Sequence, residues 1–396
     1  MNAVLKVLVV GGGVGGLTAA TAMAQRGIHV ILIEKRPAFD VPGVGLGQPA
    51  NALRVYRDLG VLDEVIESGF SYNSMHVFDN LRQHIAAHDF LLGDADTPAV
   101  CALSRSRLHD ILYAAAVAAG VEIRLGTTVR AMDETPNAVH VTFSQGTTDV
   151  FDVVAGFDGV RSTTREYLFG GAFVPRPSGF GAWRFQVTRP DCVQGMEFLQ
   201  GIGGKTGAMP LANDLMYLFH IRREEPGAVF DKADYVGLLQ ERMAQYGSYV
   251  AEARDNLTDD SGIVYSPLEP MLLPWPWHRG RVVIGGDAAH TFPPHLTQGA
   301  AMAAEDALVL ADELALPDKA LGAKLDSYAR RRYARCAFVY SFSKQWLEDE
   351  QSVMSPVQME AARAEMSLNL STRIAASDRI LNEPIIGARL PQEVSA

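Results

Sequence analysis

Apolar and polar positions at the start of the chain follow the order strand, helix, strand. Leu5–Val10 is a short run rich in β-branched residues, Leu17–Arg26 has a helical pattern, and His29–Ile33 is a second apolar run that ends at Glu34. Short apolar runs of this kind are typical of strands that are buried on both faces. The pattern therefore predicts a βαβ unit that opens a parallel sheet.

Helical and strand patterns alternate along the rest of the chain. Further helices are predicted at Asn51–Gly69, Arg107–Ala119, Tyr235–Tyr246, Ala300–Leu314, Leu325–Glu350 and Ser355–Ser367. Strands are predicted at Val121–Leu125, Val139–Phe143, Asp149–Gly156 and Arg281–Gly285. Ser71–Val100 is irregular and is expected to leave the main sheet. Ala182–Ile221 predicts an antiparallel sheet, with Tyr217 and Phe219 on one face and Leu218 and His220 on the other.

The composition argues against several classes of function. The 396 residues carry a formal net charge of −11 and no run of lysine or arginine, which disfavours a nucleic-acid partner. Cys101, Cys192 and Cys336 are odd in number and widely spaced. We interpret them as free thiols in a reducing compartment, and we expect no metal site.

One N-terminal stretch has the outline of a secretion signal. No residue between Lys6 and Arg26 is charged, and a run of small residues follows a basic start. Glycines interrupt the stretch where a signal peptide would be continuous and helix-forming, and an orderly strand follows it. We therefore interpret it as folded protein, and we expect a cytoplasmic protein without a membrane span.

The turn after the first strand fits the pattern Gly-x-Gly-x-x-Gly. In this pattern Gly11 permits the tight turn, Gly13 lets a pyrophosphate approach the backbone, and Gly16 allows a helix to pack closely on the strand. The phosphates then meet a helix N-terminus, whose free N–H groups favour negative charge. Glu34, at the end of the second strand, can accept both ribose hydroxyls and would repel a 2′-phosphate, so FAD or NAD is expected rather than NADP.

Two further motifs follow apolar runs later in the chain. Residues 156–165 come after Phe151–Ala155 and contain an Asp-Gly turn at Asp158. Residues 281–290 form a strand that ends in Gly286 and Asp287, and a proline-stiffened loop then leads into the next helix. Asp287 could bind a polyol hydroxyl, and the backbone amides of the loop could face an electron-rich ring.

Together the three motifs resemble those of the p-hydroxybenzoate-hydroxylase-like, single-component FAD-dependent monooxygenases. The resemblance covers nearly the whole chain, and the motifs occur in the order and spacing of the family. Gly285–Ala307 most resembles hydroxylases of hydroxylated aromatic or pyridine carboxylates, such as 6-hydroxynicotinate 3-monooxygenase and 3-hydroxybenzoate 6-hydroxylase. The implied fold class is α/β, with a Rossmann-like FAD-binding domain (1–70, 101–175 and 275–325), an inserted antiparallel-sheet substrate domain (71–100 and 176–274) and C-terminal helices (326–396).

The resemblance implies cofactor contacts residue by residue. The pyrophosphate of FAD would lie at Gly11, Gly13, Val14 and Gly16, and its adenosine at Glu34, Lys35 and the backbone of Val129. Arg105 and Asp287 would reach the ribityl and phosphate region. Asp158 and Arg165 match a motif associated with both FAD and the nicotinamide donor. The flavin ring would lie beside the segment from Gly43 to Asn51 and beside Gly299, Ala300 and Ala301.

The resemblance also implies a reaction. NADH or NADPH reduces FAD, O2 then forms a flavin C4a-hydroperoxide, and an activated aromatic ring takes up the distal oxygen. The protein deprotonates a ring hydroxyl, orients the ring and excludes water. The catalytic candidates are His295 and Tyr217, and the candidates for substrate contact are Gln48, Arg184 and Pro294. We expect a small aromatic substrate and O2 as partners, with a homodimer as the family default.

The candidate pocket departs from the family pattern. Thr291 stands where many relatives have proline, and Gly47 stands where enzymes of the 6-hydroxynicotinate type carry a catalytic histidine. The substrate therefore stays open, as does the choice between hydroxylation, epoxidation and attack on a larger polyketide or antibiotic. A non-catalytic flavin- or NAD-sensing regulator is a further alternative, disfavoured by the intact cofactor motifs. Residues 204–206 resemble the end of a phosphate-binding loop but lack its earlier glycine, so ATP binding is not expected.

Overall fold

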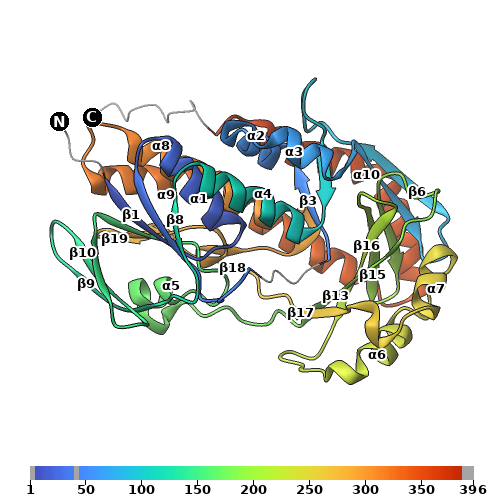
Figure 1. Ribbon diagram of the computed structural model, residues 1–396. Coiled ribbons are helices and arrows are strands. Elements are labelled where there is room, and N and C mark those ends of the chain that lie inside the picture. Colours follow the sequence, from blue (N-terminus) through green and yellow to red (C-terminus); the bar gives the residue numbers. More distant parts are fainter. Residues whose placement is uncertain (1–4, 40–43, 386–396) are drawn as a thin grey trace.

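A six-stranded sheet at one end of the molecule carries the N-terminal βαβ unit (Figure 1). The computed structural model describes residues 5–39 and 44–385. The sheet has the order β19-β20-β12-β1-β2-β8, and all neighbours run parallel except β19 and β20. Its strands are β1 (Lys6–Val10), β2 (His29–Ile33), β8 (Glu122–Arg124), β12 (Val153–Gly156), β19 (His278–Arg279) and β20 (Val282–Ile284). The predicted opening unit is confirmed.

Helices cover this parallel sheet because its central strands are apolar on both faces. Helix α1 (Val14–Gln25) packs against both α4 (Arg105–Ala118) and α8 (Gly299–Ala315). Helix α8 in turn contacts α2 (Ala50–Leu59) and the long helix α9 (Leu321–Gln351). The second motif, residues 156–165, runs into the short helix α5 (Thr163–Phe169).

The stretch predicted as one strand at Asp149–Gly156 is two strands in two different sheets. Strand β11 (Thr148–Phe151) joins β9 (Val129–Glu134) and β10 (Val139–Phe143) in an antiparallel sheet, whereas β12 enters the parallel sheet. Asp152 marks the break. Its carboxylate accepts the N–H of Lys6 at 2.7 Å, and its own N–H donates to the carbonyl of Lys6 at 2.8 Å. The sequence pattern around Asp152 gave no sign that this residue pairs with Lys6 at the start of the chain.

The second large sheet has seven strands in the order β17-β13-β16-β15-β14-β5-β6. Its strands are β5 (Ser74–Asp79), β6 (His84–Asp89), β13 (Phe180–Thr188), β14 (Met196–Gly201), β15 (Gly204–Pro210), β16 (Leu215–Arg223) and β17 (Val264–Pro267). The strands within the predicted range Ala182–Ile221 pair antiparallel, as expected, and the sheet adds one parallel pair, β14 with β5. The irregular stretch 71–100 thus supplies two strands to this sheet.

The two faces of the seven-stranded sheet are covered differently. Tyr217 and Phe219 belong to the apolar cluster that includes residues of α9 and α10 (Pro356–Asn382). Leu218 belongs to the cluster formed with α6 (Tyr235–Arg242) and α7 (Ser248–Asp255). The predicted alternation of faces is confirmed. The predicted helix at Tyr235–Tyr246 ends four positions early, at Arg242.

Two other helix predictions are corrected. The stretch Asn51–Gly69 is two helices, α2 and α3 (Leu62–Glu67), because Gly60 has a φ of 78° and ends the first one in the left-handed region. Helix α10 continues to Asn382, well beyond the predicted end at Ser367. Leu370, Ile374 and Leu381 are buried and hold this extension against the rest of the chain. The sequence pattern beyond Ser367 did not indicate their burial.

Smaller sheets connect the two ends. Strands β3 (Leu46–Pro49), β7 (Val100–Leu103) and β4 (Phe70–Tyr72) form one of them, and β18 (Met271–Leu272) pairs with β21 (His290–Thr291). Helix α9 contacts β15 of the seven-stranded sheet as well as β18, β19 and β21, so it joins both ends of the molecule. Strand β3 and the segment before α8 therefore lie between the two large sheets.

Candidate functional site

The glycine-rich turn has the geometry of a phosphate-binding turn. Gly11 has a φ of 106°, and a Cβ there would lie 2.5 Å from the carbonyl oxygen of Phe157. A Cβ on Gly16 would overlap the carbonyl oxygen of Gly11. Around Gly13, by contrast, the described residues leave open space, and none of their side chains caps the N-terminus of α1. The turn thus offers uncapped N–H groups and an unobstructed approach, which fits a pyrophosphate.

Glu34 lies beside this turn at the end of β2. Its carboxylate accepts the N–H of Gly12 at 2.8 Å and that of Arg36 at 3.0 Å. Each carboxylate oxygen can accept a second hydrogen bond, so capacity for ribose hydroxyls remains. The neighbouring Lys35 is exposed. The segment leading to Val129 lies alongside, since Thr127 N–H donates to the carbonyl of Glu34 at 2.9 Å.

A histidine outside the predicted set supports the same turn. His109 of α4 is buried, and its Nε2 lies 2.8 Å from the carbonyl oxygen of Gly12. The ring of Phe39 packs on it with 4.5 Å between centroids. His109 lies four positions after Arg105, on the same helix, and this helical spacing was the signal that could have identified it.

The Asp158 motif forms a closed local turn. Asp158 accepts the hydroxyl of Ser162 at 2.5 Å and the N–H and hydroxyl of Thr164 at 2.9 and 3.0 Å. Arg165, which is buried, donates to the carbonyl of Ala288 at 3.1 Å. The second motif is therefore tied to the third one through the Arg165 guanidinium.

A buried ion-pair network centred on Asp306 holds the third motif in place. Asp306 of α8 accepts the N–H of Gly286 at 2.8 Å, Nε2 of His290 at 2.6 Å and Nε of Arg332 at 2.6 Å. Burial by itself lowers the pKa of His290, but the charges of Cys336 and Asp306 outweigh it and raise that pKa to about 10. Asp306 thereby fixes the turn that presents Asp287 (η4, Gly286–Ala288).

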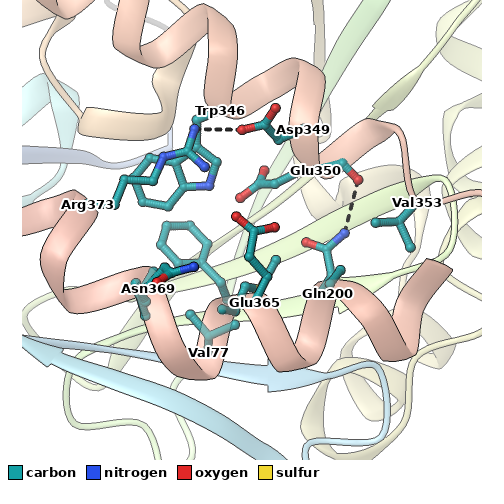
Figure 2. Close-up of a pocket in the computed structure, with 13 residues that line it drawn as sticks. Val77, Gln200, Trp346, Asp349, Glu350, Val353, Glu365, Asn369 and Arg373 are labelled. Atoms are coloured by element: carbon teal, nitrogen blue, oxygen red, sulfur yellow. Dashed lines mark hydrogen bonds and ion pairs between the residues drawn. The ribbon is translucent and has the colours of Figure 1, made fainter.

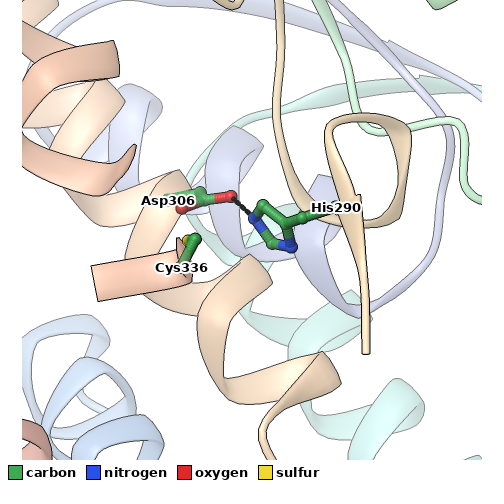
Figure 3. A group of neighbouring side chains, drawn as sticks. All are labelled: His290, Asp306 and Cys336. Carbon is green, nitrogen blue, oxygen red and sulfur yellow. Dashed lines mark hydrogen bonds and ion pairs between the residues drawn. The ribbon is translucent and has the colours of Figure 1, made fainter. Parts of the chain in front are cut away.

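His290, Asp306 and Cys336 have ligand atoms within 4.8 Å of one another, and Figure 3 shows the three side chains together. Such a trio can coordinate a metal. Here, however, the Arg332 guanidinium binds Asp306 and lies 3.8 Å from Sγ of Cys336. A cation already neutralises the carboxylate, so the trio is an ion-pair network that positions the turn.

Four predicted residues from four different elements lie near enough for their charges to act on one another, and we call the region that they border the groove. Tyr217 of β16 lies beside Arg184 of β13: burial raises the pKa of Tyr217, and the Arg184 charge opposes this. Arg105, at the start of α4, is desolvated enough that its pKa is lowered, and the nearest charges acting on it are those of Asp287 and Arg184. Desolvation raises the pKa of the Asp287 carboxyl, while His290 and Arg105 lower it, although the side chain stays open to the groove.

Strand β3 forms one wall of this groove. A Cβ on Gly45 would lie 2.9 Å from Cβ of Tyr217, and a Cβ on Gly47 would lie 2.8 Å from Cγ2 of Thr297 and 3.1 Å from Cε of Met209. The space for a side chain at position 47 is thus occupied. Gln48 is fully buried and faces away, since its amide accepts the Tyr56 hydroxyl at 2.6 Å and donates to the carbonyl of Gly47 at 2.7 Å. Gly43 lies outside the described residues.

The loop before α8 holds His295 turned toward α9. The imidazole is buried, and its Nε2 lies 3.0 Å from Oε2 of Glu350, which also binds Nζ of Lys205 at 2.6 Å. Burial and the nearby Lys205 charge lower the pKa of His295 to about 4, even though Glu350 opposes this. The ring is therefore neutral at neutral pH. Lys205, part of the rejected phosphate-loop pattern, serves in this ion pair.

The end of the same loop leads to the start of α8. Pro294 is half-buried in the turn η5 (Pro294–Leu296), and Gln298 exchanges two hydrogen bonds with Asn51, at 3.0 and 3.2 Å. Gly299, Ala300 and Ala301 form the first turn of α8, which no side chain of residues 5–39 or 44–385 caps. Helix α8 also contacts strand β3.

Relatives among known proteins match most of this chain. The profile of the FAD binding domain family matches residues 4–183 and 273–343. YetM of Bacillus subtilis strain 168, provisionally named an FAD-dependent monooxygenase, is 34% identical over 86% of this chain and 92% of its own. A 2-heptyl-3-hydroxy-4(1H)-quinolone synthase of Pseudomonas aeruginosa is 30% identical over 85% and 87%. The 6-hydroxynicotinate 3-monooxygenase of Bordetella bronchiseptica is 28% identical over 88% and 93%.

A solved structure confirms the fold class. Klebsiella pneumoniae HpxO in complex with FAD and uric acid has a TM-score of 0.83 with this chain, at 21% identity, and covers 96% of this chain and 98% of its own. In the part of the chain that the structure describes, no helix combines the length and apolar character needed to cross a membrane.

Proposed function

This chain belongs to the FAD binding domain family and is an FAD-dependent monooxygenase, and on that premise we propose that it hydroxylates an electron-rich aromatic ring bearing an acidic oxygen. The observation that carries the proposal is that Arg184 lies beside Tyr217 while Arg105 and Asp287 act on each other's charge in the same region. One oxygen atom of O2 enters the ring as a hydroxyl and the other leaves as water. NADH or NADPH, with one proton, supplies the two electrons.

The proposed contacts to FAD follow the geometry of the groove. The turn of Gly11, Gly13, Val14 and Gly16 would hold the pyrophosphate, with Glu34, Lys35 and Val129 around the adenosine. Arg105 and Asp287 would hold the ribityl chain, and the first turn of α8 would bind the ring. When bound and reduced, FAD supplies the activation of O2. Asp158 would contribute to FAD binding indirectly. Its side chain holds a local turn, and Arg165 connects that turn to the segment that carries Asp287.

The polar end of the substrate is proposed to bind Tyr217 and Arg184. Burial raises the pKa of Tyr217, so its phenol is a neutral donor at neutral pH, and Arg184 beside it is a cation. A phenol donor next to a guanidinium suits a carboxylate or a phenolate oxygen. The relatives named for a hydroxynicotinate and for a heptyl-bearing quinolone support an aromatic ring in general and do not select one ring.

His295 is proposed as a positioning residue. Its imidazole binds Glu350 of α9, and this contact fixes the proline-rich loop against that helix. Pro294 on the same loop would then border the ring of the substrate. Gln48 would act in the same indirect way, because its amide holds the backbone of Gly47 and the hydroxyl of Tyr56.

The test is substrate-dependent electron transfer by the FAD-loaded enzyme. A panel of hydroxybenzoates, hydroxypyridine carboxylates and hydroxyquinolines is offered with NADH or NADPH, while nicotinamide oxidation, O2 uptake and hydroxylated product are measured together. At least one ring should stimulate all three in a one-to-one ratio. Unchanged nicotinamide oxidation across the panel, with no hydroxylated product, would overturn the proposal.

A further inference from the structure

A hollow separate from the cofactor groove opens between α9, α10 and the seven-stranded sheet (Figure 2). It opens to solvent, and its lining combines apolar with charged side chains. Phe198 and Val77 form its sheet side and Trp346 its α9 side. Glu365 reaches into it from α10, and Arg373 closes one edge by pairing with Asp349 at 2.8 Å.

A second hollow of about 450 Å³ lies on the other side of Phe198 and Trp346, which line both. Its lining is mainly apolar and includes Met75, Met196, Leu92, Ile374 and Leu381. Two polar side chains of its wall have partners. Asp378 accepts the N–H of Leu91 at 2.7 Å, and the hydroxyl of Ser377 donates to the carbonyl of Ile374 at 2.8 Å. Nδ1 of His295, in the same wall, has no hydrogen-bond partner among the described residues. The inner hollow therefore suits a mainly apolar group.

The inner hollow borders the proposed ring site. Pro49 and Thr297 both line it. Pro49 ends strand β3, two positions after Gly47, and Thr297 is the residue that fills the space at Gly47. Met209, on the other side of Gly47, belongs to the same apolar cluster as Met196 of the hollow. The inner hollow thus adjoins the proposed ring site, and Phe198 and Trp346 stand between it and the outer hollow; we call the two hollows together the tail channel.

The chemistry of the tail channel defines its occupant. The inner part is apolar, with methionines that adapt to ligands of different shape. At the outer part the carboxylates of Asp349, Glu350 and Glu365 face Arg373, and the excess of negative charge opposes an anionic end group. An uncharged hydrocarbon chain satisfies both conditions.

We propose that the substrate carries an uncharged alkyl or prenyl-type chain and that this chain lies in the tail channel while the ring lies at Tyr217 and Arg184. The inference rests on the proposed function, because it needs the ring to lie at the groove. It also explains the extended helix α10: Ile374, Ser377 and Leu381 come from the part of the helix beyond residue 367 and complete the inner wall.

The first test is the dissociation constant for para-alkylphenols from methyl to nonyl, measured by equilibrium dialysis against FAD-loaded enzyme. Each methylene that enters the apolar channel should tighten binding about fourfold, which corresponds to about 0.8 kcal/mol. A nonyl chain that ends in a carboxylate should bind more weakly than the plain nonyl chain. Affinity that does not increase with chain length would overturn the inference.

The second test places bulk in the channel and beside it. Ser377→Phe fills the inner hollow and Ala362→Phe the outer one, whereas Ser367→Phe and Ala364→Phe make the same changes at exposed positions of α10. Both channel variants should bind methylphenol normally, which shows that they fold. As the alkyl chain of the phenol lengthens, affinity should stop increasing at a shorter chain in Ser377→Phe than in Ala362→Phe. The inference fails if each variant and its exposed control give the same chain-length series.

The two proposals fail in different ways. If long-chain phenols bind tightly but no ring is hydroxylated, the proposed function is wrong and the apolar site still stands as a binding site. If short-chain rings are hydroxylated and chain length changes neither binding nor turnover, the function stands and the tail channel is wrong.

Discussion

Oε2 of Glu350 lies 3.0 Å from Nε2 of His295, so a carboxylate on the long helix α9 holds the ring of a loop residue that precedes α8. Lys205 of β15 binds the same carboxylate at 2.6 Å. The three side chains are buried and come from three separate elements. This cluster joins the seven-stranded sheet, α9 and the loop that borders the proposed flavin site.

The cluster predicts a loss of stability in mild acid. The pKa of His295 in the folded protein is about 4, below its ordinary value of 6.5, so the folded state binds fewer protons than the unfolded state between these values. Stability from His295 is therefore complete above pH 6.5 and is lost as the pH falls toward 4. We expect His295→Gln to reduce the pH dependence of the unfolding free energy between pH 7 and pH 5 by about 1–2 kcal/mol.

Urea unfolding of wild type and His295→Gln at the two pH values measures this difference. His29→Gln, at an exposed position at the start of β2, is the matched control and should behave like wild type. Equal pH dependence in wild type and His295→Gln would contradict this account, because it would show that His295 has the same pKa in the folded and the unfolded protein.

The glycine-rich turn predicts that two similar substitutions act differently. Gly13→Ala meets open space in the protein, so the stability of the cofactor-free chain should stay unchanged while FAD affinity falls about tenfold or more, because the methyl group lies where the pyrophosphate approaches. Gly16→Ala overlaps the carbonyl of Gly11 and should also destabilise the free chain, by about 1–3 kcal/mol. Thermal unfolding without FAD and a flavin fluorescence titration separate the two effects. Equal loss of stability in both variants would contradict this account.

The buried Asp306 predicts a connection between ion pairing and FAD binding. Asp306→Asn removes the charge that faces Arg332 and His290 and should destabilise the fold by about 3–5 kcal/mol. FAD affinity should fall as well, because the N–H of Gly286 is held by the same carboxylate. Asp318→Asn, at an exposed position after α8, serves as the control for both the melting temperature and the FAD titration. Unchanged FAD affinity at a temperature where the variant is folded would show that Asp306 does not position the turn.

The pair of Tyr217 and Arg184 predicts effects that do not add. Tyr217→Phe and Arg184→Met should each raise KM for the best acidic ring about tenfold with a smaller change in kcat, since each removes one donor to the same oxygen. Because the two side chains lie side by side and would bind the same oxygen, the double variant should lose less than the product of the single losses. Steady-state kinetics of the four proteins measure this. If the loss in the double variant equals the product of the two single losses, the two residues contact separate parts of the substrate.

Local patterns predicted the cofactor site because its signals are short in sequence. The glycines at positions 11, 13 and 16 and the carboxylate of Glu34 belong to one βαβ unit, in which neighbours in sequence are neighbours in space. The motifs at Asp158 and Asp287 likewise each depend on a strand followed by a turn. The assignment of domains to ranges of the chain stays a prediction.

The sequence by itself determined the parallel sheet, the FAD-binding family and the alternation of faces at Tyr217, because periodicity and turn chemistry act over a few residues. Only the tertiary structure decided the direction of His295, which depends on Glu350 and Lys205 from distant elements. The same holds for the division of residues 149–156 between two sheets and for the tail channel beneath the extended helix α10. These features depend on burial against residues far along the chain, and a linear pattern contains no record of which distant side chains fill a given space.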